Sequence, residues 1–106
     1  MENSKICGLL GLAMKAGKIV FGTEACTTDI NKEKIKLLII AKDASDRTKK
    51  NFRYICEQKG IPIYEILHIK DISQSIGKDN KAVIGIKDIN FSKAIMEIIN
   101  GGEIIG

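Results

Sequence analysis

The residues whose types and spacing most favour binding chemistry lie in the stretch KIVFGTEACTTDI, from Lys18 to Ile30. The part before Gly22 is typical of a short strand, and the part after it is typical of a helix. A glycine followed by a small polar residue at a helix start, here Gly22 and Thr23, often forms an anion site, because backbone N–H groups and the positive end of the helix dipole point outward there. Glu24 places a negative charge in the same turn, which fits a helix start that is only well capped.

Basic residues gather near this turn and near the expected start of a later helix. Lys15 and Lys18 precede the turn, and a second group comprises Lys42, Arg47, Lys49, Lys50 and Arg53. Binding to a phosphate backbone needs such grouping, and the formal net charge of +4 with a pI near 9.0 favours an anionic partner. A solvated helix face explains the second group equally well, because part of it lies opposite the apolar side of its helix.

The sequence contains no residue pattern typical of a metal site. His68 is the only histidine, and no Cys–His spacing suits zinc. The three cysteines, Cys7, Cys26 and Cys56, are widely spaced among apolar or helix-forming neighbours. We expect all three to be buried, reduced core residues rather than nucleophiles, because a reactive thiolate needs a nearby base.

Enzymatic chemistry is not expected either. The glycines of CGLLGLAMKAGK do not follow a strand and fit neither the phosphate-loop pattern nor the dinucleotide-binding pattern. Glu24, Asp43 and Asp46 are carboxylates at expected helix starts, where capping explains them without catalysis. We therefore predict a non-enzymatic protein with no catalytic residue, no metal, no cofactor and no small-molecule substrate.

Hydrophobic periodicity and turn residues divide the chain into alternating helices and strands. Helices are expected at 5–15, after Gly22, between a cap at Asp43 or Ser45 and a stop at Gly60, at 70–77 and at about 88–99. Strands are expected at 19–21, 36–41, 61–67 and 82–86. The strand at 36–41 is apolar throughout. This pattern is typical of a strand that helices cover on both faces, so we expect it to be central in the sheet. The pattern predicts an α/β fold with a mixed or parallel sheet between helix layers.

The 106 residues show no internal repeat or linker and are long enough for one core, so we expect a single domain spanning 1–106. The tail GGEIIG has no evident role and is expected to fray. The longest apolar runs, such as LLIIA, are too short to cross a bilayer, and no leader pattern is present. We expect a cytoplasmic protein without a membrane partner.

Three segments together resemble the ribosomal protein family of the L7Ae and L30e type. They are FGTEACTTDINKEKIKLLIIAKDAS, YICEQKGIPIYEI and SIGKDNKAVIGI. The resemblance covers Lys5 to about Ile99, preserves the loop lengths, and is strongest to the small bacterial YlxQ-like branch. It implies a three-layer α/β/α sandwich with a mixed sheet of about four strands. It also implies that the partner is structured RNA of the kink-turn type, a sharply bent internal loop with sheared G·A pairs, or ribosomal RNA on the ribosome.

The family's pattern at the strand-to-helix turn is Gly-x-Asn-Glu-x-x-Lys, whose polar residues reach base edges and phosphates at the kink. Gly22 and Thr23 match the first two positions. Glu24 stands where Asn is usual, Ala25 where Glu is usual, and Thr28 where Lys is usual. An ionised glutamate only accepts hydrogen bonds, and alanine makes none at a base edge. We expect phosphate contacts to replace the lost base contacts, which makes binding weaker and more salt-sensitive.

The resemblance also implies a second contact surface, in the loop between the third strand and the fourth helix, where apolar residues pack on extruded bases. In this chain the loop consists of Ile66, Leu67, His68 and Ile69. His68 either stacks on a base or is an exposed imidazole without a partner. The family's acidic residue after the second strand is replaced by Lys42, with Asp43 retained beside it.

The expected RNA-binding residues are Lys18, Gly22, Thr23, Glu24, Thr28, Lys42, Asp43, Arg47, Ile66, Leu67 and His68. The first hypothesis is a non-enzymatic RNA-binding protein similar to ribosomal proteins. The alternative is a protein-interaction module that has kept the scaffold and lost the kink-turn site. The changes at Glu24, Ala25 and Thr28 are what favour this alternative.

Overall fold

Helices and strands alternate along the chain in the computed structural model, which describes residues 2–101. The helices in this part are α1 (Glu2–Lys15), α2 (Thr23–Asn31), α3 (Asp46–Lys59), α4 (Ile69–Ser75) and α5 (Ile89–Ile99). The strands are β1 (Ile19–Phe21), β2 (Leu37–Ile40), β3 (Ile63–Glu65) and β4 (Val83–Ile86). The alternation predicted from hydrophobic periodicity is therefore confirmed element by element.

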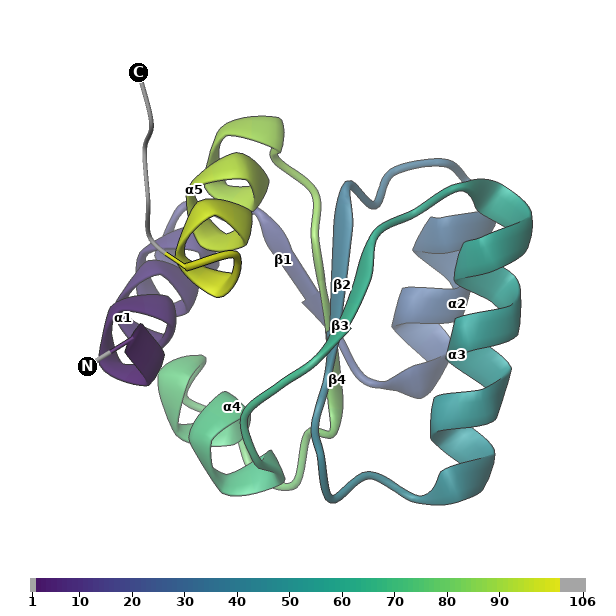
Figure 1. Ribbon diagram of the computed structural model, residues 1–106, viewed down its shortest axis with the longest axis horizontal. Helices are drawn as coiled ribbons and strands as arrows, with labels where there is room; N and C mark the ends of the chain where they lie inside the picture. Colours follow the sequence, from purple (N-terminus) through teal and green to yellow (C-terminus); the bar gives the residue numbers. More distant parts are fainter. Residues whose placement is uncertain (1, 102–106) are drawn as a thin grey trace.

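The four strands form one mixed sheet in the order β1-β4-β2-β3. Strand β4 pairs antiparallel with both β1 and β2, and β2 pairs parallel with β3. Helices α2 and α3 cover one face of this sheet, and α1, α4 and α5 cover the other (Figure 1). This arrangement confirms the expected three-layer α/β/α sandwich with a mixed four-stranded sheet.

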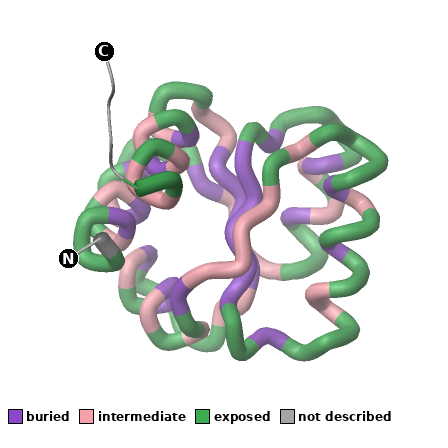
Figure 2. The backbone as a smooth tube through the Cα atoms, in the orientation of Figure 1, coloured by how far each residue is buried: buried purple, intermediate pink, exposed green. Residues whose placement is uncertain are grey.

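The two central strands, β2 and β4, form the middle of the core. Every residue of both strands is buried, and Figure 2 shows this buried band between the two helix layers. A strand that helices cover on both faces is apolar along its whole length rather than alternating. The uniformly apolar run of β2 therefore identified a central strand correctly, and β4 lies beside it.

Three helix ends have clear local causes. The side chain of Ser45 accepts a hydrogen bond from the N–H of Thr48 and caps α3, and Gly60 ends that helix in the left-handed conformation. The carboxylate of Asp88 accepts from the N–H of Phe91 at 2.9 Å and caps α5. Of the two caps considered for α3, Ser45 is the one that the structure shows.

Several local predictions differ from the structure. Helix α1 begins at Glu2, three residues before the predicted start, and β3 is only three residues long. Cys7 is half-buried rather than buried, because it lies at the edge of the face that α1 turns to the core. Cys26 and Ile30 are the buried residues of α2, and Ala25 beside them is exposed. Most of the tail GGEIIG, residues 102–106, lies outside the described residues.

Candidate nucleic-acid interface

The ends of all four strands bring four loops to one edge of the sheet. Phe21 at the end of β1 lies opposite Ile84, and Ile40 at the end of β2 lies opposite Val83 and Glu65. The segments that follow β1, β2 and β3 and the one that precedes β4 therefore meet at the lower edge in Figure 1. We call this surface, formed by residues 22–28, 42–47, 66–69 and 78–82, the loop edge.

Backbone hydrogen bonds connect these loops across the sheet. The N–H of Gly22 donates to the carbonyl of Val83 at 3.0 Å, and the N–H of Ala41 donates to the carbonyl of Ala82 at 2.8 Å. The N–H of Lys42 donates to the carbonyl of Leu67, also at 2.8 Å. The loop edge is thus positioned by the strand pairing rather than by flexible loops alone.

The turn at Gly22 begins α2 in a conformation that favours glycine. Its φ is 91° and its ψ is 157°, a region that residues with a Cβ rarely adopt. A Cβ built on Gly22 would meet no atom within 4 Å, so the requirement comes from the backbone angle and not from crowding. Thr23, Glu24 and Thr28 are exposed beyond this turn, where they are accessible to a ligand.

A groove between α2 and α3 brings Thr23 close to Arg47. Its volume is about 340 Å³, and it is lined by Thr23, Thr27, Arg47, Thr48, Asn51, Phe52 and Ile55. A second hollow, lined by Thr23, Glu24, Thr27 and Thr28, adjoins it on α2. Arg47 is exposed, and no ion pair in residues 2–101 involves it. An anion in this groove can therefore reach a free guanidinium and the hydroxyls of α2.

Asp43 connects the loop after β2 to the start of α4. Its carboxylate accepts a hydrogen bond from the N–H of Ile69 at 2.8 Å. A carboxylate at a helix N-terminus is stabilised by the helix dipole. Asp43 therefore has a structural partner at the loop edge, and its neighbour Lys42 is exposed beside it.

His68 is exposed at the start of α4 and has a carboxylate neighbour. The side chain is 60% exposed, and its Nδ1 lies 3.7 Å from Asp71 Oδ2. The N–H of His68 also donates to that same oxygen at 3.2 Å. His68 is therefore the exposed loop imidazole that was expected, with the carboxylate of Asp71 beside it.

Leu67 is a residue for which the expected role is wrong. It is 2% exposed and packs in the core, with a φ of 64° that turns its side chain inward from the loop. A buried side chain cannot stack on a base from outside. Ile66 and Ile69 on either side are half-buried, so they present the accessible apolar atoms of this loop.

Lys18 lies at the opposite edge of the sheet from Gly22. It immediately precedes β1, and its carbonyl accepts a hydrogen bond from the N–H of Lys87 at 2.8 Å. Four strand steps separate it from Gly22, about 13 Å at the usual rise per residue. The expectation that Lys18 joins the other candidate residues is therefore wrong, because β1 separates residues that are close in sequence.

The sequence interpretation missed Lys78 and Lys81, in the loop between α4 and β4. Their ammonium groups lie 5.3 Å and 5.4 Å from the centre of the Phe21 ring, within cation–π range. The N–H of Lys81 donates to Ser73 Oγ at 2.8 Å. Because Phe21 directly precedes Gly22, these two lysines belong to the loop edge. The charged turn KDNK before a strand was the signal available in the sequence.

Two basic residues grouped near Arg47 in the sequence are already paired. Lys49 Nζ lies 2.9 Å from Glu65 Oε2, and Arg53 forms an ion pair with the other carboxylate oxygen of Glu65. Hydrogen bonds from Lys49 and Arg53 lower the pKa of the Glu65 carboxyl. Lys49 therefore contributes less to a phosphate surface than its position in the sequence indicated.

Charges of both signs are present at the loop edge. Lys42, Arg47, Lys78 and Lys81 lie among Glu24, Asp43, Asp46 and Asp79. Within residues 2–101 no group of three or more His, Cys, Asp or Glu side chains is arranged to hold a metal ion. In the same part of the chain, no helix combines the length and apolarity that a bilayer span needs.

Comparison with known proteins shows the family to which the chain belongs. Residues 4–96 match the profile of the ribosomal protein L7Ae/L30e/S12e/Gadd45 family. The chain is 41% identical over 100 residues to the RNA-binding protein YlxQ of Enterococcus faecium, covering 94% of this chain and 96% of that protein. It is 28% identical over 92 residues to the RNA-binding protein YlxQ of Bacillus subtilis, covering 87% and 92% of the two chains.

Solved structures share the fold. A Bacillus halodurans protein of unknown function superimposes with a TM-score of 0.88 at 31% identity, covering 91% of this chain and 97% of that one. The 15.5kD RNA binding protein of Giardia lamblia superimposes with a TM-score of 0.78 at 23% identity, covering 94% and 87%. The second likeness concerns the fold alone.

Proposed function

Since the chain belongs to the ribosomal protein L7Ae/L30e/S12e/Gadd45 family, we propose that it is a non-enzymatic protein that binds structured RNA through its loop edge. The observation that carries this proposal is the convergence of the open α2 start at Gly22 with Arg47, Lys78 and Lys81 on one edge of the sheet. Two YlxQ relatives named as RNA-binding proteins match nearly the whole chain, which supports the same partner.

The kink-turn is the RNA shape that we propose for this surface. Gly22 has no side chain at the turn, so an RNA backbone can approach α2 closely. Glu24 can accept a hydrogen bond from a guanine N–H, but its charge repels a nearby phosphate. Arg47 and Lys42 supply phosphate contacts that fix the register without reading bases. We expect specific binding that is weaker and more salt-dependent than in a site with all the usual polar residues.

The start of α4 supplies the second part of the proposed contact. Half-buried Ile66 and Ile69 flank an exposed His68, and an exposed imidazole can stack on an unpaired base. The carboxylate of Asp71 lies 3.7 Å from the imidazole, on the side of the ring that carries Nδ1. Leu67 has no place in this contact because it is buried.

Restoring the family's usual polar residues tests the location of the site. The variant Glu24→Asn/Ala25→Glu/Thr28→Lys regains a donor and a positive charge on exposed positions of α2. One good polar base contact contributes about 1–3 kcal/mol, so we expect the variant to bind a kink-turn RNA about tenfold more tightly in a fluorescence titration. A straight duplex should gain much less.

The matched control is Glu57→Gln, which raises the net charge by the same amount on an exposed part of α3. It should change the affinity for both RNAs slightly and equally. If the triple variant and Glu57→Gln behave alike, α2 is not part of the RNA interface and the proposed site is wrong.

A protein-interaction module is the second candidate function. The observation that favours it is that Glu24, Ala25 and Thr28, the three departures from the family pattern, are all exposed on α2. A partner protein recovered with the full chain and retained after nuclease treatment would support this alternative. Loss of every partner upon nuclease treatment would support the RNA proposal instead.

The last part of the proposed function concerns the domain as a whole and its place in the cell. We propose that residues 1–106 act as one RNA-binding domain, and that the protein works in the cytoplasm on ribosomal RNA or another structured RNA. Sedimentation of the protein with ribosomal particles at low salt, and its release at high salt, would be the expected behaviour of such a surface.

A further inference from the structure

A second basic surface lies at the edge of the sheet opposite the loop edge. Lys18 precedes β1, Lys36 precedes β2, and Lys87 follows β4. The N–H of Lys87 donates to the carbonyl of Lys18 at 2.8 Å, and the N–H of Lys36 donates to the carbonyl of Ile86 at 2.8 Å. Because β4 lies between β1 and β2, these three lysines are neighbours although they are far apart in the sequence.

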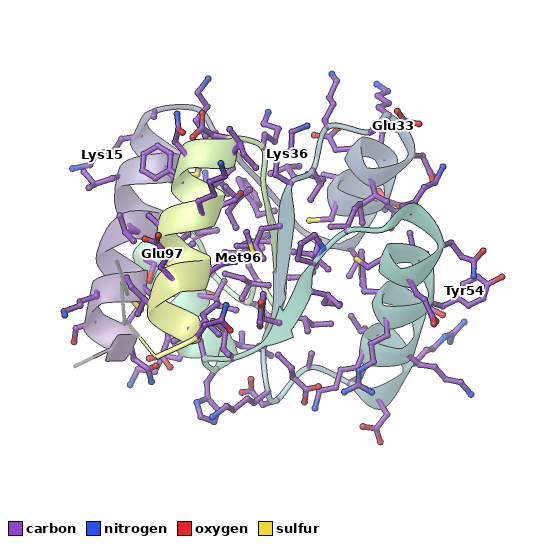
Figure 3. The ribbon with its side chains drawn as sticks, turned by 45° about the horizontal axis from the view of Figure 1, so that its top comes forward. Lys15, Glu33, Lys36, Tyr54, Met96 and Glu97 are labelled. Atoms are coloured by element: carbon purple, nitrogen blue, oxygen red, sulfur yellow. The ribbon has the colours of Figure 1, made fainter. Side chains whose placement is uncertain are left out.

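Further lysines extend this surface on both sides. Lys15 ends α1, Lys34 lies in the turn after α2, and Lys59 ends α3. Figure 3 shows Lys15 and Lys36 along the edge that this view brings forward, with Glu33 farther along it. We call the surface formed by Lys15, Lys18, Lys34, Lys36, Lys59 and Lys87 the lysine edge.

The positive charge of the lysine edge is largely uncompensated. No ion pair within residues 2–101 involves any of its six lysines. Glu33 is the exposed carboxylate among them, and the carboxylate of Asp88 nearby is engaged in capping α5. At the loop edge, by contrast, basic and acidic side chains alternate. With six lysines against the carboxylates of Glu33 and Asp88, the lysine edge has an excess of positive charge.

The lysine edge also contains a hollow with an apolar floor. The hollow has a volume of about 350 Å³ and is lined by Ile30, Glu33, Ile35, Lys36, Lys59, Gly60, Ile61 and Pro62. Lys36 and Lys59, together with the carboxylate of Glu33, thus flank a depression lined by three isoleucines and a proline. A nucleotide has the matching chemistry, because its phosphate pairs with lysine and the flat face of its base covers apolar surface.

We propose that the lysine edge is a second RNA-binding surface, which holds the phosphate backbone of a single-stranded segment while the loop edge holds a folded one. The choice of RNA as the polyanion rests on the proposed function. The two edges face opposite ends of the strands, so a segment bound at one leaves the other accessible. Contacts of lysine with phosphate carry no base information, so this second surface is tolerant of sequence.

The test maps the binding of a short single-stranded RNA to the full chain. A 12-nucleotide oligouridine, which cannot form a kink-turn, is titrated into ¹⁵N-labelled protein while backbone amide resonances are followed. We expect the largest shifts at Lys18, Lys36 and Lys87, with smaller ones around Lys59. Shifts confined to the loop edge, or no shift anywhere, would overturn the proposal.

Two charge variants add a quantitative readout. Lys36→Gln/Lys87→Gln removes two charges from the lysine edge, and Lys5→Gln/Lys50→Gln removes two from exposed positions of α1 and α3. Losing two phosphate contacts to a single strand should reduce the slope of log affinity against log salt by about 1.4. The first variant should show this reduction and bind oligouridine at least threefold more weakly than the second. Equal losses in both variants would contradict the proposal.

Two further measurements test whether the lysine edge binds RNA rather than free phosphate, and whether it is separate from the loop edge. Inorganic phosphate, at the same concentration of phosphate groups as the RNA, should leave the lysine-edge resonances nearly unshifted; equal shifts would show a free-anion site instead. Lys36→Gln/Lys87→Gln should bind a minimal kink-turn RNA as the wild type does. Failure of kink-turn binding by the wild type counts against the proposed function, and the oligouridine map still decides whether the lysine edge binds RNA.

Discussion

The three thiol groups of the chain have different chemical environments. Desolvation by burial raises the pKa of Cys26 to about 12 and that of Cys56 to about 11. Cys26 Sγ also donates to the carbonyl of Val20 at 3.7 Å. Cys7 on α1 is only half-buried. Since the thiolate is the reactive form, burial and the raised pKa values should both slow the reactions of Cys26 and Cys56.

Alkylation of the native protein should therefore be selective. At pH 8 we expect iodoacetamide to modify Cys7 first, with Cys26 and Cys56 at least tenfold slower. Peptide mass spectrometry after timed quenching measures the three rates, and labelling in denaturant provides the reference in which all three react alike. Native modification of Cys26 as fast as Cys7 would show that α2 opens readily from the sheet.

The conformation of single residues was predicted from the sequence in some cases and not in others. The strand-to-helix turn at Gly22 was predicted correctly because a strand, a glycine and a helix start form a local pattern. The burial of Leu67 was not predicted, because its neighbours in the sequence do not indicate a positive φ at this position or a side chain that packs in the core. Lys18 was grouped with the turn at Gly22 because the two are close in sequence. In the structure the length of β1 separates them.

Packing of the helices and loops against the sheet explains a glycine in β4. Gly85 is buried between its neighbours, and an added Cβ would lie 2.7 Å from Ile35 Cδ1 and 3.1 Å from Val20 Cγ1. Both contacts are closer than ordinary van der Waals distance, and Ile35 is itself buried. A larger residue at this position must displace side chains from the core.

Two glycine-to-alanine variants should therefore have opposite effects on stability. Gly85→Ala should lower the free energy of unfolding by about 1–3 kcal/mol through overpacking. Gly8→Ala, on α1 where a Cβ meets nothing within 4 Å, should raise it by about 0.5–1 kcal/mol, because alanine favours a helix interior. Urea unfolding followed by circular dichroism measures both. A neutral Gly85→Ala would mean that Ile35 moves aside freely.

Glu65 links the end of β3 to α3 through Lys49 and Arg53. Hydrogen bonds from these partners lower the pKa of Glu65 from its ordinary value of 4.5. The unfolded chain then binds a proton at Glu65 more readily than the folded protein does. The stabilising contribution is therefore present above about pH 4.5 and is lost as the pH falls through the lowered value.

Glu65→Gln should flatten the loss of stability in this acid range. Thermal melts between about pH 3 and pH 6 should show a smaller fall in melting temperature for the variant than for the wild type. Lys49→Gln/Arg53→Gln, which removes the partners instead, should flatten the curve in the same way. The effect is small because the pair is exposed to solvent; parallel curves for all three proteins would contradict it.

At the scale of elements, hydrophobic periodicity was sufficient to order the helices and strands. The uniformly apolar run Leu37–Ile40 identified a central strand because its burial on both faces leaves no polar positions. Strand pairing was not predictable in the same way, since it depends on contacts between distant segments. The role of the loop between α4 and β4 was missed for this reason, because Lys78 and Lys81 meet Phe21 only in the folded sheet.

For the whole molecule, the positions of the charged residues indicate more about binding than the net charge does. The formal net charge of +4 favoured an anionic partner. The folded chain places a mixed set of charges at the loop edge and, at the opposite edge, the lysines that are unpaired within residues 2–101. Binding at the loop edge should therefore combine polar contacts with phosphate contacts from Lys42 and Arg47, whereas charge should dominate at the lysine edge.

The central claim is that the loop edge recognises bent, structured RNA. The most direct measurement is the affinity of the unmodified protein for a kink-turn RNA and for a straight duplex of equal length and composition, at two salt concentrations. We predict that the kink-turn binds about tenfold or more tightly at both concentrations, and that both affinities fall as salt rises. Equal or negligible binding of the two RNAs would contradict the claim.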